Sequence, residues 1–300
     1  MNDSPQINDL PDIDSLWNYE RPAETERAFR ELLEKAAKSD EEYRAELLTQ
    51  IARCQGLQGN FAEAHCTLDQ VQEILTPGMP TVTARYLLER GRVFNSAGEA
   101  EKTGSLFRKA WDTAKEYGPD HLAVDAAHMI GIVEKGESSL AWNEKALSLA
   151  RSSTDPRAEK WIGSLFNNIG WTRHEMGEYE KALELFQGAL EFRKSQGNDS
   201  EIRIARWCVA RCLRSLGRIN EAPNIQRELE QDETSDGYVY EEIGECLLQM
   251  NKPVDAEPYF RKAYLLLSGD SWLQKNEKKR LNRLAELDNV NACDSGQDDD

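Results

Sequence analysis

Residues 164–190 read SLFNNIGWTRHEMGEYEKALELFQGAL, and this stretch decides the fold of the chain. Gly170 carries no side chain, which lets two helices approach closely. Gly177, followed by Glu178 and Tyr179, supplies the residue types of a tight turn. Small and bulky apolar residues then recur at helical spacing, at Ala182, Phe186 and Ala189. The stretch therefore predicts two helices packed against each other across a short turn.

The same positions resemble the tetratricopeptide repeat, a helix-turn-helix unit of about 34 residues. That family has a bulky residue, a Leu-Gly pair, a Tyr, a Gly-x-Tyr turn and then Ala, Phe and Ala. The residues that match this pattern are Phe166, Ile169, Gly170, Gly177, Tyr179, Ala182, Phe186 and Ala189. Arg173 stands where the family has Tyr.

Further copies of the pattern appear along the chain, as a repeat architecture requires. With the first copy at Gly163, the others start near Ala45, Ala84, Asp120, Arg203 and Gly237. The resemblance implies an all-α fold, a right-handed α-solenoid of about six helix-turn-helix repeats, in the long-repeat variant of the family.

Two copies depart from the pattern. The copy near Asp120 places its turn glycine, Gly136, two residues late, and the copy near Arg203 carries Pro223 in its second helix. Proline lacks a backbone N–H and is tolerated only in the first turn of a helix.

Both ends of the array are expected to be capped, because terminal repeats would otherwise expose an apolar face. The sequence predicts a solenoid over 22–287, with an N-terminal cap helix at 22–38 and a C-terminal cap helix at 271–287. Residues 1–21 are expected to form an acidic tail, partly disordered or loosely docked, and 288–300 a disordered acidic tail.

Charge and hydropathy exclude several classes of function. The 300 residues include 37 Lys and Arg against 54 Asp and Glu, a net charge of −17. Such a chain opposes the approach of nucleic acid, so no nucleic-acid partner is expected. There is no long apolar run and no basic N-terminal signal segment, so we expect no membrane association and a cytoplasmic location.

No metal, cofactor or catalytic group is predicted. Three of the six cysteines, Cys54, Cys212 and Cys246, fall in the same repeat position and are interpreted as small packing residues. The four histidines show no metal-binding spacing with them, and motifs for phosphate binding or nucleophilic catalysis are absent. The sequence therefore predicts a protein that is not an enzyme.

Candidate binding residues come from the first helix of each repeat, which lines the concave groove in the resembled family. The residue after each small packing position is largely basic or aromatic: Arg53, Arg92, His128, Trp171, Arg211 and Glu245. Nearby positions of the same helices add Asn95, Asn167, Asn168, His174, Trp207 and Arg214. Arginine can bind a carboxylate through two hydrogen bonds, and tryptophan offers an apolar surface.

Two interpretations of this charge stand side by side. The arginines can bind an acidic or carboxylate-bearing peptide in the groove, or they can pair internally with acids of the neighbouring repeat such as Glu241, Glu242 and Glu245.

The predicted function is a non-catalytic protein-protein interaction module, an adaptor or scaffold that binds a peptide or protein segment in the concave groove. As a hypothesis, Arg92, Arg211 and Arg214 contact acidic groups while Asn167, Trp171 and Trp207 hold the backbone and an apolar side chain. The alternatives are a regulator that senses a short signalling peptide or small molecule, and a subunit that self-associates. Since a fold does not fix a function, the sequence names neither the partner nor the oligomeric state.

Overall fold

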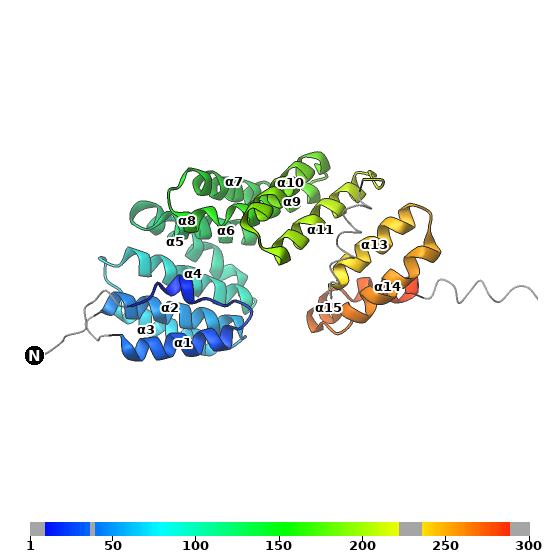
Figure 1. Cartoon of the computed structure of the whole chain (residues 1–300). Helices are drawn as coiled ribbons and strands as arrows, with labels where there is room; N and C mark the ends of the chain where they lie inside the picture. The colour runs from blue at the N-terminus through cyan, green and yellow to red at the C-terminus, as the bar shows by residue number, and fades with distance from the viewer. Residues whose placement is uncertain (1–9, 37–39, 222–235, 289–300) are drawn as a thin grey trace, which may run out of the picture. The chain divides into compact units, whose positions relative to one another are not determined.

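The computed structural model describes residues 10–36, 40–221 and 236–288, and all regular structure in them is helical (Figure 1). The chain divides into two compact units, Met1–Leu165 and Phe166–Asp300, hereafter unit 1 and unit 2. In each unit, successive helices pack in antiparallel pairs, the first helix of a pair leading through a short turn into the second.

Unit 1 begins with a short 3-10 helix and a single α-helix, followed by consecutive helix pairs. The elements are η2 (Ile13–Leu16), α1 (Pro22–Lys35), α2 (Glu41–Leu57), α3 (Phe61–Ile74), α4 (Pro80–Ser96), η3 (Ala100–Lys102), α5 (Thr103–Tyr117), α6 (Asp120–Val133), α7 (Gly136–Ser152) and α8 (Pro156–Glu159).

Unit 2 consists of helices of the same kind. Its first helix is α9, whose first four residues, 162–165, are assigned to unit 1. Its elements are α9 (Ile162–Glu175), α10 (Tyr179–Gln196), α11 (Asp199–Ser215), α13 (Gly237–Gln249), α14 (Pro253–Leu267), α15 (Ser271–Asn276) and α16 (Lys278–Asp288). The second helix predicted for the copy near Arg203, with Ala222 and Pro223, lies outside the described residues.

Three of the described helix pairs are held together where a glycine of the first helix meets a phenylalanine ring of the second. The ring and the bare backbone touch, and a Cβ atom at the glycine would lie only 2.4, 2.6 or 2.8 Å from the ring. All three rings are fully buried. The pairs are Gly91 with Phe107, Gly170 with Phe186, and Gly244 with Phe260.

The pair formed by α6 and α7 uses a different contact at this place. Asn143, which stands where three other copies have phenylalanine, packs against Gly131, and a Cβ atom at Gly131 would lie 2.3 Å from the Asn143 amide nitrogen. Gly131 comes one helical turn after Ala127, the residue that the sequence pattern places at the close approach. This replacement explains why the copy near Asp120 matches the pattern poorly.

The turns between paired helices adopt a left-handed backbone conformation. Gly177 has φ of 78°, a region that costs glycine little because it lacks a Cβ atom. Asn251 takes the same place in the turn between α13 and α14 with φ of 58°, and asparagine is one of the few other residues that tolerate it.

Both predicted cap helices differ from their expected bounds. The N-terminal helix α1 ends at Lys35, because Ala36 is extended, and residues 37–39 lie outside the description. The single C-terminal helix predicted over 271–287 is two helices, α15 and α16, broken at Glu277. The break lets Leu273 and Leu281, which lie on either side of it, both join the core beneath α14.

The described part of the N-terminal segment is docked, one of the two states expected for this tail. Residues 10–21 do not form a free tail, since Ile13 is buried in a cluster with Phe29 and Leu47, and η2 lies against the helices of unit 1 (Figure 1). This packing depends on contacts with residues far along the chain, which local composition does not reveal.

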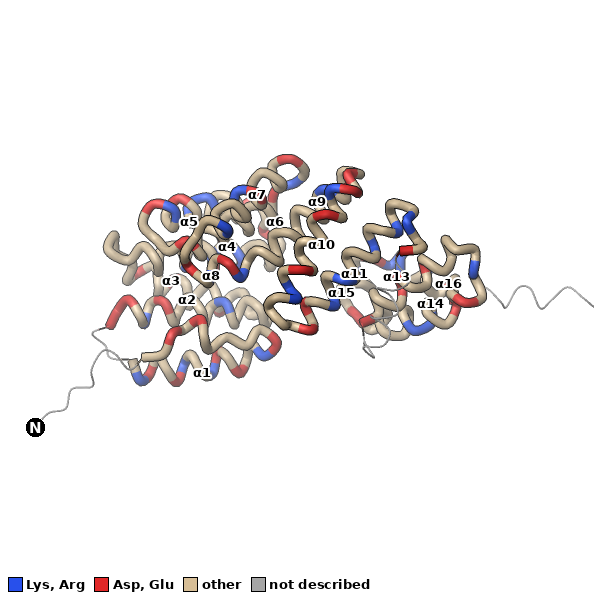
Figure 2. The backbone as a smooth tube through the Cα atoms, turned by 45° about the horizontal axis from the view of Figure 1, so that its top comes forward, with Lys and Arg blue, Asp and Glu red and all other residues tan. Residues whose placement is uncertain are grey.

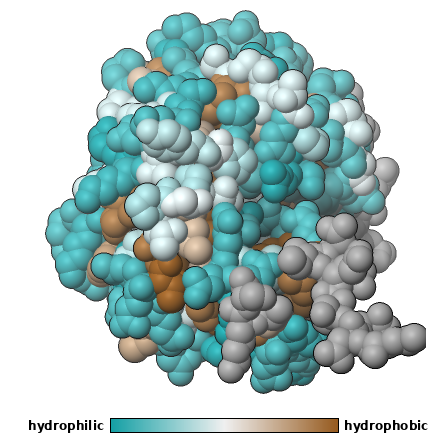
Figure 3. Space-filling model, turned by 90° about the vertical axis from the view of Figure 1, so that its left-hand side faces the viewer, coloured by the Kyte–Doolittle hydropathy of each residue, from teal (hydrophilic) through white to brown (hydrophobic). Residues whose placement is uncertain are grey.

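The visible surface carries few apolar side chains. The face in Figure 3 is mostly hydrophilic, and its hydrophobic residues form small separate patches. Among the described residues, no helix combines the length and the apolar character that crossing a lipid bilayer demands.

The close helix approach is testable with a matched pair of substitutions in unit 1. Gly91→Ala places a methyl group against Phe107, and because overpacking strains a core, we expect the free energy of unfolding to fall by about 1–3 kcal/mol. Gly104→Ala, on α5 with nothing within 4 Å, should leave it unchanged or raise it by up to about 1 kcal/mol. Urea titrations followed by far-UV circular dichroism measure both, and equal losses would contradict the interpretation.

Candidate functional site

A charged cavity of about 470 Å³ lies within unit 2, on the first helices of its repeats and on α16. We name it the charged cavity. Acidic and basic residues lie close together on α11 and α13, as Figure 2 shows. The residues that line it are Trp171, Trp207, Arg211, Arg214, Tyr238, Glu241, Glu242, Glu245, Arg280 and Arg283.

Most of this charge is paired across neighbouring helices. Arg214 binds Glu242 through two hydrogen bonds, Nε to Oε1 at 2.6 Å and Nη2 to Oε2 at 3.0 Å. Arg280 of α16 binds Glu241 in the same two-pronged way, with Nε to Oε1 at 2.9 Å and Nη2 to Oε2 at 2.5 Å.

Glu245 is the third glutamate of the cavity, and it is paired with Arg283. Its carboxylate accepts a hydrogen bond from Arg283 and lies 3.9 Å from Nη1 of Arg214. Each of the three glutamates therefore has an arginine as its main partner.

Arg211 is the fourth arginine and has no glutamate of its own among the described residues. Its Nε lies 3.6 Å from Glu242, which is already bound by Arg214, and its Nη1 donates to Ser215 Oγ at 3.1 Å. Burial lowers the pKa of Arg211, and the adjacent Arg214 lowers it further, against the opposing effect of Glu242. The cavity thus holds one cation that its own carboxylates neutralise incompletely.

An aromatic wall borders the charged cavity. The rings of Trp171 and Trp207 lie 5.7 Å apart, and Trp207 also packs near Tyr238 at 6.4 Å. The Trp207 indole is fixed because its Nε1 donates to the Tyr238 carbonyl oxygen at 3.1 Å. Both tryptophans are only half-buried, so they offer an apolar surface to a bound molecule.

His174 packs against the aromatic wall without lining the charged cavity. Its ring packs on Trp171 at 5.1 Å, and its Nε2 lies 2.9 Å from Ser215 Oγ. Burial lowers the pKa of His174, and Arg211 and Arg214 lower it further. The ring is therefore held neutral near pH 7 and adds no charge to the cavity.

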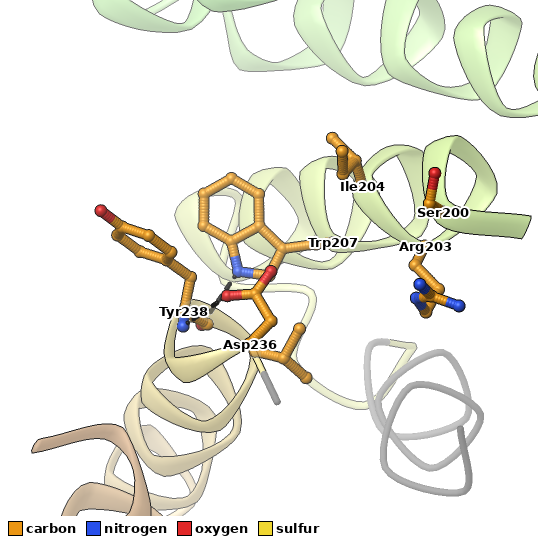
Figure 4. Close-up of a pocket in the computed structure, with 7 residues that line it drawn as sticks. Ser200, Arg203, Ile204, Trp207, Asp236 and Tyr238 are labelled. Atoms are coloured by element: carbon orange, nitrogen blue, oxygen red, sulfur yellow. Dashed lines mark hydrogen bonds between the residues drawn. The ribbon is translucent and has the colours of Figure 1, made fainter. Parts of the chain in front are cut away.

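Trp207 and Tyr238 also border a second space, an apolar pocket of about 530 Å³ between α11 and α13 (Figure 4). We name it the apolar pocket. Ile204, which is exposed, is one of its apolar lining residues. The residues that line it are Ser200, Arg203, Ile204, Trp207, Asp236, Tyr238 and Val239.

Unit 1 contains a smaller cavity of about 200 Å³ on its first helices, bordered by Arg53, Arg92 and Asn95. Its arginines share one buried acid, Glu89, whose oxygens accept from Arg53 Nη1 at 3.1 and 3.2 Å and from Arg92 Nη1 at 2.6 Å. Arg92 also binds the buried Asp125. Burial raises the pKa of Asp125, but Arg92 and Arg53 outweigh it and hold that pKa below its ordinary value.

The remaining predicted site residues have structural contacts. His128 packs on the Trp161 ring at 5.0 Å and interacts with Asn143. Asn167 accepts a hydrogen bond from Cys208 Sγ at 3.1 Å, and the Asn168 carbonyl accepts one from Thr172.

The structure therefore sorts the predicted residues into groups. Unit 1 brings Arg53, Arg92 and Asn95 to one cavity, while Asn167, Asn168, His128 and His174 border neither charged space. The charged cavity collects Trp171, Trp207, Arg211, Arg214 and Glu245.

Sequence reasoning did not place Tyr238, Glu241, Glu242, Arg280 and Arg283 in this site. The two arginines lie three residues apart on one face of α16, a spacing visible in the sequence. Their partners on α13 become evident only once that helix packs nearby.

The described cysteines and histidines offer no evident metal site. No group of three or more His, Cys, Asp or Glu with the arrangement of a metal site occurs among the described residues. Cys54, Cys212 and Cys246 are buried, and burial raises the pKa of Cys54 to about 12 and that of Cys212 to about 11. The Cys54 and Cys212 thiols therefore remain protonated near neutral pH.

Comparison with known proteins identifies the repeat. Residues 163–196 match the tetratricopeptide repeat family. Over 253 residues the chain is 22% identical to outer dynein arm-docking complex subunit 4 from Xenopus laevis, covering 81% of this chain and 46% of that protein. The chain thus spans about half the length of this relative.

Solved structures share the fold at low sequence identity. One is a signal transduction ATPase with numerous domains (STAND) protein with a tetratricopeptide repeat sensor, from Pyrococcus horikoshii, with a TM-score of 0.69 at 14% identity over 88% of this chain and 42% of that chain. Another is a tetratricopeptide repeat protein from Parabacteroides merdae, with a TM-score of 0.55 at 16% identity over 92% of this chain and 96% of that one.

The two arginines on α11 should differ in their effect on stability. Arg214→Ala leaves the buried Glu242 without its main partner, so we expect the free energy of unfolding to fall by about 3 kcal/mol. Arg211→Ala should lower it by less than about 1 kcal/mol, because the Arg211 side chain is 31% exposed and its pair is long. Urea unfolding of the two variants measures this, and a larger loss for Arg211→Ala would reverse the assignment.

Proposed function

Because the chain is a tetratricopeptide-repeat protein of the all-α solenoid class, as residues 164–190 predict, we propose that it is a non-catalytic adaptor that binds a protein segment in the charged cavity of unit 2. One observation carries the proposal: Trp171, Trp207, Arg211 and Arg214, chosen from the sequence, border a single cavity of about 470 Å³.

The chemistry of the cavity favours a segment with an acidic side chain beside an apolar one. Arg211 supplies the incompletely neutralised cation, and a ligand carboxylate there would replace the long contact to Glu242 with a direct ion pair. An apolar side chain fits against the half-buried Trp171 and Trp207, which are separated by 5.7 Å.

Arg214 takes a different role from the one expected of it. Its two hydrogen bonds to Glu242 make it a positioning residue that fixes the floor of the cavity, while Arg211 contacts the ligand. Arg53 and Arg92, which are bound to Glu89, form a similar paired framework in unit 1.

The similarity to a docking complex subunit supports a protein as the partner. Residues of both charges around the cavity also suit a polypeptide, whose backbone and side chains present donors and acceptors together.

A second candidate is a sensor of a short peptide or small molecule, which the apolar pocket favours. Its volume of about 530 Å³ lies in the range of small-molecule sites, and Ile204, Trp207 and Val239 supply the apolar lining. The STAND protein, which shares the fold, carries a tetratricopeptide repeat sensor. Native mass spectrometry of the purified chain would support this candidate if it detected a bound small molecule as added mass. The Ile204→Asp variant should then lack that added mass.

The adaptor proposal predicts that Arg211 is needed for partner capture. Affinity purification from a cell extract, with partners identified by mass spectrometry, should lose a specific set of proteins with Arg211→Glu, because the ligand carboxylate would meet a like charge. Arg218→Glu is the matched control, since it makes the same charge change on a residue that lies outside the cavity and contacts Glu221.

Circular dichroism should show that both variants are folded. Identical partner sets from the wild-type chain and the Arg211→Glu chain would contradict the assignment of the charged cavity.

A further inference from the structure

The N-terminal segment crosses the first helices of unit 1, the face that carries the charged cavity in unit 2. It contacts α2 through Trp17, whose Nε1 donates to Gln50 Oε1 at 2.9 Å, and α4 through Asp14, which accepts from Arg85 Nη2 at 2.7 Å. The segment is drawn in dark blue in Figure 1. A short piece of chain thus lies on the groove side of unit 1 as a bound peptide would.

Asp14 occupies a carboxylate site built by several helices. Besides Arg85, its Oδ2 lies 3.6 Å from Arg157 Nη1 of α8 and 3.9 Å from His121 Nε2 of α6. Burial raises the pKa of Asp14, but Arg85, His121 and Arg157 outweigh it and hold that pKa below its ordinary value. Residues distant in sequence therefore converge on one side-chain carboxylate.

The same basic groups are positioned by other acids of unit 1. Arg85 Nε lies 2.7 Å from Glu46 Oε1, and Asp155 holds both Arg157, at 3.1 Å, and His121, at 2.8 Å. The carboxylate site is consequently fixed by the fold and does not depend on Asp14 for its shape.

An aromatic site adjoins the carboxylate site. The Trp17 ring stacks on Tyr19 at 4.6 Å, meets Phe29 edge-on at 5.5 Å, and lies under the guanidinium of Arg53 at 5.8 Å. Its hydrogen-bond partner Gln50 is only 2% exposed. A buried polar group therefore recognises the indole N–H, which an apolar contact alone would not do.

Asp14 and Trp17 reach their two sites together because of the local backbone. Asp14 lies in the 3-10 helix η2, and Trp17, three residues later, is the extended residue that ends it. The recognised pattern is thus an acidic residue followed three positions later by an aromatic one.

Besides Asp14 and Trp17, the segment is held by hydrogen bonds between Asn18 and Thr25 and from Tyr43 to the Pro11 carbonyl, while most of its side chains are exposed. Ile13 is buried, whereas Leu16 is 36% and Tyr19 59% exposed. A segment with so little buried surface can be exchanged for another of the same chemistry.

We propose that this face of unit 1 is a second binding site, for a partner segment with an acidic side chain three residues before a Trp or Tyr, and that residues 13–19 occupy it until such a partner displaces them. This second site is made of other residues than the charged cavity in unit 2. Because residues 13–19 occupy the second site, a ligand can bind there only if it displaces them.

The test uses a fluorescein-labelled peptide of residues 10–21 as the probe, titrated with the full chain and followed by anisotropy. In the chain variant Asp14→Ala/Trp17→Ala the groove has lost its own anchors, so the peptide should bind at least about tenfold more tightly than to the wild-type chain. Glu20→Ala is the matched control. It removes one acid from the same segment, and it should bind the peptide as weakly as the wild type does.

Peptide variants test the two anchors without altering the protein. We call the Asp14→Ala/Trp17→Ala variant the opened chain. Peptides carrying Asp14→Asn or Trp17→Ala should each bind the opened chain about tenfold more weakly than the unaltered peptide does. Arg211→Gln in the opened chain should leave peptide binding unchanged, which separates this site from the charged cavity.

Equal affinity of the peptide for the wild-type and opened chains, or equal affinity of the three peptides for the opened chain, would overturn the proposal. So would an affinity of the wild-type chain that changes with its own concentration, because that result would place the segment on a second copy.

Discussion

The close contact between a helix backbone and a phenylalanine ring is the constraint on which the rest of this structure depends. At Gly91, Gly170 and Gly244 the first helix of a pair gives up its side chain so that a ring of the second helix can touch it. The contact fixes the rotation of the first helix. The residue that follows each glycine then points about 100° away, toward the groove, and these residues are Arg92, Trp171 and Glu245. In each of these repeats the glycine sets the packing of the helix pair, and the next residue in the sequence contributes to the groove surface.

Both units use the same electrostatic device beneath their grooves. A buried glutamate on one first helix holds two arginines: Glu89 binds Arg53 and Arg92, and Glu242 binds Arg214 closely and Arg211 loosely. Removing either glutamate would take a main carboxylate partner from two partly buried arginines, so these networks hold the groove side chains in place. In the proposed function, the ligand is recognised by Arg211, which this network leaves incompletely neutralised.

The grooves of the two units differ in what fills them. In unit 1 a segment of the chain itself supplies a carboxylate and an indole, through Asp14 and Trp17, and the remaining cavity is about 200 Å³. In unit 2 the corresponding helices border about 470 Å³, with Arg211 and two tryptophans on its wall. One repeat architecture thus carries two proposed sites of related chemistry, for an acid beside an aromatic or apolar group, and in unit 1 the chain's own segment makes the contacts proposed for a partner.

The sequence alone determined the helix pairs and their turns, because both follow from spacings within about 34 residues. Gly170, Phe186 and Gly177 stand at fixed distances whatever the rest of the chain does. The replacement of phenylalanine by Asn143, the break at Glu277 and the docking of residues 13–19 were decided by tertiary contacts. The same holds for the pairing of the arginines. These ion pairs join side chains of different repeats. Glu242 lies 2.6 Å from Arg214 and 3.6 Å from Arg211, so the choice of its main partner depends on a difference of about an ångström in how α11 and α13 pack. The spacing of residues in the sequence does not contain that distance.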